Sequence, residues 1–138
     1  MKIPFAEVNL RLESGRTDFE EPRCFVFGSE DAVKRVYGAS SVRPILDFGQ
    51  SVVIAVHRGV QRSGGYGLEV EAVEAEGDQI TVHVRRVNPA PGAFVTMALT
   101  YPRKHIRVER ADLGGDGPWT FHFADEKGHI FAAVHEQV

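Results

Sequence analysis

Six histidines are spread over the 138 residues of the chain, and imidazole is a common zinc ligand and a common proton acceptor in catalysis. No two lie four residues apart on an expected helix, and no cysteine or carboxylate stands at a zinc-ligand interval. His122, His129 and His135 could approach one another across a C-terminal hairpin, but pairing within that hairpin explains them equally well. His83, His105 and His122 take the polar side of alternating segments, where we expect solvated rings. We predict no metal site.

A second possible chemistry lies in the run Arg62-Ser63-Gly64-Gly65-Tyr66-Gly67, which holds a hydroxyl and a phenol among three glycines. Ser63 has no Gly-x-Ser-x-Gly context and no histidine and aspartate couple nearby in sequence, so covalent catalysis is not indicated. Glycine loops that hold phosphate open a helix, whereas a strand is expected here. The one cysteine, Cys24, precedes Phe25-Val26-Phe27 and is expected to fill apolar space. We predict neither catalytic residues nor a cofactor.

The elements that must position these residues are strands. Apolar and polar residues alternate over residues 51–110, with turn residues about every ten positions, which predicts an antiparallel β meander. Val52, Ile54 and Val56 share one face of a half-buried strand. The adjacency of Ala72 and Val73 breaks the alternation and predicts a bulge. Further strands are expected over residues 6–13, 24–27, 80–87, 93–99, 103–110, 120–124 and 129–134, with turns at residues 14–18 and at Arg43-Pro44.

A single helix is expected between Ser29, which can cap its first N–H groups, and Gly38, which can end it. Val33, Val36 and Tyr37 form a narrow apolar stripe along it. Because a helix of about two turns is marginal alone, it must rest on the sheet. The sequence therefore predicts a mainly β fold, a sandwich or partly open barrel of eight to nine antiparallel strands with one short helix.

The totals favour a single domain over residues 1–138, without internal repeats. Sixteen basic and nineteen acidic residues give a net charge of −3, which favours neither nucleic acid nor an anionic membrane as partner. The N-terminus lacks the apolar core of a signal peptide, and no run approaches the ~20 apolar residues that span a bilayer. As the sequence stands, we expect a cytoplasmic protein.

Several short motifs between residues 50 and 110 follow one another in the order and spacing of a known family. They are Val52-Val53-Ile54-Ala55-Val56, Gly59, Ser63-Gly64-Gly65-Tyr66-Gly67-Leu68-Glu69-Val70, Pro89-Ala90-Pro91-Gly92 and Leu99-Thr100-Tyr101-Pro102. This pattern resembles the C-terminal domain of PrcB, the accessory subunit of a bacterial protease complex. The family usually shows threonine where this chain has Ser63. The resemblance implies association with a protease, and it implies that some relatives are exported.

We therefore predict a non-catalytic protein-binding module that acts through its Gly-Gly-Tyr and proline-rich loops. Tyrosine buries a large area at low entropy cost, and prolines reduce the ordering penalty of binding. The predicted partner-binding residues are Ser63, Gly64, Gly65, Tyr66, Pro89, Pro91, Gly92, Tyr101 and Pro102.

Three other interpretations stay open. The glycine run could be a plain hairpin corner with Tyr66 packed at its base. The histidines could serve a small metal-binding or enzymatic domain. The chain could also be a structural domain that associates with itself through an exposed strand edge, as a homo-oligomer.

Overall fold

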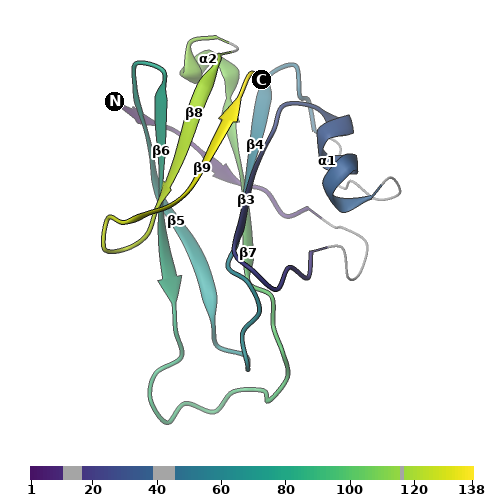
Figure 1. Cartoon of the computed structure of the whole chain (residues 1–138), viewed down its shortest axis with the longest axis vertical. Helices are drawn as coiled ribbons and strands as arrows, with labels where there is room; N and C mark the ends of the chain where they lie inside the picture. Colours follow the sequence, from purple (N-terminus) through teal and green to yellow (C-terminus); the bar gives the residue numbers. More distant parts are fainter. Residues whose placement is uncertain (11–16, 39–45, 116) are drawn as a thin grey trace.

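The computed structural model describes residues 1–10, 17–38, 46–115 and 117–138, and these form a sandwich of two β-sheets (Figure 1). The five-stranded sheet has the order β1-β5-β6-β8-β9, and the four-stranded sheet has the order β2-β7-β4-β3. The strands are β1 (Lys2–Ile3), β2 (Ala6–Glu7), β3 (Arg23–Phe27), β4 (Ser51–His57), β5 (Gly67–Glu76), β6 (Gln79–Val87), β7 (Arg103–Glu109), β8 (Trp119–Ala124) and β9 (Ile130–Glu136). The helices are α1 (Glu30–Tyr37) and α2 (Arg110–Leu113).

The predicted mainly β sandwich of eight to nine strands is confirmed, with two departures in the described residues. A second, four-residue helix, α2, follows β7. The pair β6 and β8 is parallel, whereas all strands were expected to be antiparallel. The reason is that the chain leaves β6, forms β7 in the other sheet, and returns beside β6 in the same direction, which only a long connection allows.

The predicted meander is wrong, because the strands of residues 51–110 are divided between the two sheets. Strand β4 lies between β3 and β7, while β5 and β6 pair with each other in the opposite sheet. Alternation marks which face of a strand is buried, but both inner faces of a sandwich alternate in the same way. Within residues 51–110 the chain therefore crosses between the sheets twice, between β4 and β5 and again between β6 and β7.

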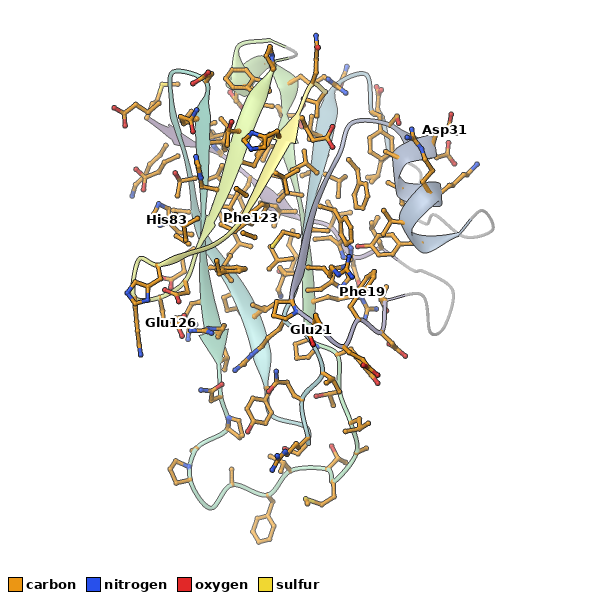
Figure 2. The ribbon with its side chains drawn as sticks, viewed as in Figure 1. Phe19, Glu21, Asp31, His83, Phe123 and Glu126 are labelled. Atoms are coloured by element: carbon orange, nitrogen blue, oxygen red, sulfur yellow. The ribbon has the colours of Figure 1, made fainter. Side chains whose placement is uncertain are left out.

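The main core lies between the sheets and is built from the side chains that the alternation placed inward. Val52, Ile54 and Val56 of β4 face the inner residues of β6 and β8, including Phe123, which is labelled in Figure 2. Each of these side chains is almost fully buried. Removing one such side chain from water contributes about 1.5–3 kcal/mol, so this layer supplies much of the stability.

A second apolar layer covers the outer face of the four-stranded sheet. Val53 and Ala55, on the far side of β4, pack with Val33 and Tyr37 of α1, so β4 is buried on both faces and not half-buried as expected. The helix begins as predicted, with the Ser29 hydroxyl accepting from the N–H of residue 32 at 3.1 Å, and it ends at residue 38 at positive φ. Its predicted contact with the sheet is confirmed.

Smaller expectations have mixed outcomes. The strand expected over residues 6–13 is present only as β2, and residues 11–16, like the bend at Arg43-Pro44, lie outside the described residues. The bulge predicted at Ala72 and Val73 is present in β5, but the register shifts just before them, between Val70 and Ala72. The C-terminal hairpin is confirmed as β8 and β9.

Candidate functional site

Two of the connections between the sheets, from β4 to β5 and from β6 to β7, lie at the same end of the sandwich, the lower end in Figure 1. We call residues 61–67 the glycine loop and residues 88–102 the arch. Gln61 and Thr100 exchange two backbone hydrogen bonds, of 2.8 and 3.0 Å, and the N–H of Gly64 donates to the carbonyl of Thr96 at 2.9 Å. The Thr100 hydroxyl also donates to the carbonyl of Ser63 at 2.7 Å. The glycine loop therefore braces the arch.

Two glycines make this close approach possible. At Gly65, φ is +87°, and a Cβ there would stand 2.8 Å from Cβ of Pro89 and 2.9 Å from Cγ1 of Val95. A Cβ at Gly64 would lie 2.5 Å from the Thr96 hydroxyl. Real Cβ atoms are not found at such distances, so side chains at these positions would push the glycine loop and the arch apart.

Arg58 holds the base of both connections, a role that sequence reasoning missed. Its guanidinium donates to the carbonyl oxygens of Gly67 at 3.2 Å and Val87 at 2.7 Å, and to Oδ1 of Asn88 at 2.5 Å. The same group lies 5.1 Å from the centre of the Tyr66 ring, within the range of a cation–π contact. One side chain from the end of β4 thus joins the start of β5 to the end of β6.

The middle of the arch carries three apolar side chains that face solvent. Phe94 is fully exposed, and Met97 and Leu99 retain 88% and 63% of their accessible surface. We call these three residues the tip. No charged residue occurs between Val87 and Pro102. A cluster of exposed large apolar side chains is unusual for a surface that contacts only water, and it marks this end as a candidate binding surface.

The strand predicted over residues 93–99 is wrong, because these residues belong to neither sheet. Their composition favours a strand, but the arch extends beyond the ends of β6 and β7, and none of the strands in the described residues pairs with it. A turn in which the N–H of Ala93 donates to the carbonyl of Ala90 at 3.0 Å sends the chain outward.

The predicted site residues are brought to this one end of the molecule, in different roles. Ser63, Gly64, Gly65 and Pro89 meet where the glycine loop contacts the arch, while Pro91 and Gly92 stand exposed at its turn. Tyr66 is half-buried and, with Pro102, lines a shallow groove of about 410 Å³. Tyr101 lines a separate groove. The peptide bond between Tyr101 and Pro102 is trans, and the one cis peptide bond in the described residues precedes Pro118.

Sequence reasoning missed the tip. Phe94, Met97 and Leu99 fall within the strand predicted over residues 93–99, which the structure lacks. The sequence does contain a sign of this exposed apolar surface, because the run without charge between Val87 and Pro102 is long for a connection in contact with solvent.

A buried polar trio, Tyr37, His57 and His105, lies between the four-stranded sheet and α1. The Tyr37 hydroxyl is 2.5 Å from Nε2 of His57 and 3.0 Å from Nε2 of His105. The His57 ring also stands edge-on to Phe19, which lies on the α1 side of the sheet in Figure 2. His105 was expected in solvent, and this is wrong because the helix layer covers the outer face of β7.

Burial governs the ionisation of the trio. Desolvation by burial lowers the pKa of His57 to about 3 and that of His105 to about 4. Besides burial, His105 and Arg103 lower the pKa of His57, and Arg103 lowers that of His105. Burial raises the pKa of Tyr37. All three side chains are therefore neutral at pH 7.

The other histidines bind different neighbours. His83 contacts the Glu74 carboxylate at 3.0 Å across β5 and β6, His122 bonds to the Gln79 side chain at 2.5 Å, and His135 bonds to the Thr120 hydroxyl at 3.0 Å. Among the described residues, no three histidine, cysteine or carboxylate side chains gather closely enough to share a metal ion.

Cys24 packs against the main core, and burial raises the pKa of its thiol to about 12, as suits an apolar filler. In the described ranges, no helix is long and apolar enough to cross a bilayer.

The fold and the site together define a class, a β-sandwich domain that displays two mutually braced inter-sheet connections with an apolar tip. Residues 52–109, a little under half of the chain, match the family PrcB C-terminal, which confirms the predicted resemblance over roughly residues 50–110. The match runs from β4 into β7 and includes the glycine loop and the whole arch. No curated protein and no solved structure matches the chain.

Proposed function

We propose that this protein is a non-catalytic binding module that associates with a protease and helps to assemble or regulate its complex. The match of residues 52–109 to the PrcB C-terminal family supports a role in a protease complex. The proposed contact surface is the end of the sandwich that carries the glycine loop and the arch.

The exposed tip is the observation that carries this proposal. Phe94 and Met97 keep nearly all of their surface in water, on a connection that is held by the glycine loop. Burying such side chains against a partner releases water from apolar area, and a braced loop loses little conformational entropy when it binds. Large apolar and aromatic anchors of this kind commonly dominate the energy of protein interfaces.

The direct test is to identify the peptidases that the same genome encodes, beginning with any whose gene lies beside this one, and to titrate each into the purified chain by calorimetry. We expect binding, and we expect Phe94→Ser to weaken it by about 30-fold, the effect of losing an anchor worth about 2 kcal/mol. Ile130→Ser is the matched control, because Ile130 is an exposed apolar residue of β9, outside both connections. Equal loss from both variants, or no binding by the unmodified chain, would contradict the proposal.

A further inference from the structure

We infer that residues 93–99 bind by strand addition, pairing their open backbone edge with an exposed strand edge of the protein partner. This inference rests on the proposed function and specifies how the arch would make contact. It assigns part of the affinity to main-chain hydrogen bonds and not only to the side chains of the tip.

The backbone of this segment is unpaired over an unusual length. Within the described part of the chain, none of the six N–H groups from Phe94 to Leu99 donates a hydrogen bond, and only the carbonyl of Thr96 accepts one from the backbone. Solvent satisfies these groups in the isolated chain. A partner strand could replace that solvent with a ladder.

The composition of the segment suits a strand. Ala93-Phe94-Val95-Thr96-Met97-Ala98-Leu99 contains aromatic and β-branched residues and no proline, glycine or charge. Uncharged segments of six or seven residues with these properties readily pair with other strands when they are exposed. The segment therefore has the composition of a strand, but in the isolated chain it pairs only near its end, with the glycine loop.

One edge of this incipient strand is already occupied. Gln61 faces Thr100 and Gly64 faces Thr96, so the glycine loop runs antiparallel to the end of the segment. The chain bends at Ala98, and pairing with a partner strand would straighten it. Backbone groups of the extended segment would then alternate in direction, which turns those of positions 96, 98 and 100 toward the glycine loop. The groups of Val95, Met97 and Leu99 then face the open edge.

The partner edge must have a matching character. Because no charge occurs from Val87 to Pro102, a partner charge brought against the segment would lose its hydration without gaining a counter-ion. We therefore expect an exposed strand whose side chains beside the contact are apolar or neutral. The bonds that anchor Ala93 and Thr100 hold both ends of the segment in place, which lowers the entropy cost of pairing.

Proline scanning with matched controls tests this inference against the same peptidase. Met97→Pro removes an outward N–H together with the side chain, Met97→Ala removes the side chain alone, and Ala98→Pro removes an inward N–H. We expect Met97→Pro to bind at least about 10-fold more weakly than Met97→Ala, and Ala98→Pro to stay within about 3-fold of the unmodified chain. In the complex, amide exchange of Val95, Met97 and Leu99 should slow. Circular dichroism would verify the fold of each variant.

The outcomes separate the two levels of the proposal. If Met97→Pro and Met97→Ala bind alike and the three amides stay unprotected while Phe94→Ser still weakens binding, strand addition is overturned and the binding module stands. If the unmodified chain does not bind the peptidase, both are overturned. A dimer in light scattering without the peptidase, converted to monomer by Met97→Pro, would assign the open edge to a second copy of the chain and overturn the hetero-partner.

Discussion

Gly65 stands at the tightest contact between the glycine loop and the arch, and it carries two separate constraints. Its φ of +87° is strained for any side chain, and a Cβ would press on Pro89 and Val95. Gly92 shares the first constraint only, because its φ is +79° and no atom lies within 4 Å of a Cβ built there. A comparison of the same substitution at Gly65 and at Gly92 therefore distinguishes the cost of backbone strain from the cost of a steric clash.

We expect Gly65→Ala to lower the free energy of unfolding by about 2–4 kcal/mol and Gly92→Ala by about 1 kcal/mol, since the first adds a clash to the strain. Urea denaturation of both variants measures the difference. Faster exchange of the Thr100 amide in Gly65→Ala alone would trace the loss to the brace. Equal destabilisation by both changes would show that the arch yields to the added methyl group.

At the scale of elements, the trio of Tyr37, His57 and His105 ties α1 to β4 and β7 through neutral groups. An unfolded histidine binds a proton near pH 6.5, whereas the folded pKa values are about 3 and about 4. The unfolded chain therefore binds more protons as the pH falls below 6.5. The stability that these neutral rings contribute is complete above that pH and is lost toward pH 4.

We predict that the free energy of unfolding falls by up to about 1.4 kcal/mol per pH unit for each of the two histidines between pH 6 and pH 4. Urea titrations at a series of pH values would measure this slope. His57→Leu should flatten it, while His129→Ala, a change at an exposed turn, should leave it intact. A slope unaffected by His57→Leu would mean that other groups govern the acid sensitivity.

The sequence predicted the positions of strands and helices better than it predicted which strands pair with each other. Alternation located β4 and β6 and their inward residues, and the caps located α1, because these signals are local. The assignment of β4 and β5 to different sheets depends on pairing between distant segments, which a period of two does not encode.

The same limit explains the errors at the candidate site. His105 alternates as a solvated residue would, but the covering layer comes from α1, far away in the sequence. Phe94 and Met97 have strand composition, yet their backbone lies beyond the last available partner. The motif order within residues 50–110 nevertheless pointed to the end of the molecule that carries the candidate site, because the motifs flank the crossings from β4 to β5 and from β6 to β7.

On the scale of the whole molecule, the sandwich and the tip are energetically separate. The core lies between the sheets and under α1, whereas Phe94, Met97 and Leu99 bury little surface in the isolated chain. Replacing all three by serine should therefore change the free energy of unfolding by less than about 1 kcal/mol, while light scattering at high concentration should show less self-association. A large loss of stability would mean that the tip packs against the sandwich.

The crossings from β4 to β5 and from β6 to β7 each leave one sheet and enter the other, and Arg58, just after β4, binds β5 and β6 of the opposite sheet. A pulling force applied to the arch is consequently transmitted to both sheets and not to one alone. Such a force shears the two sheets against each other, so a partner bound at this end acts mechanically on the whole sandwich.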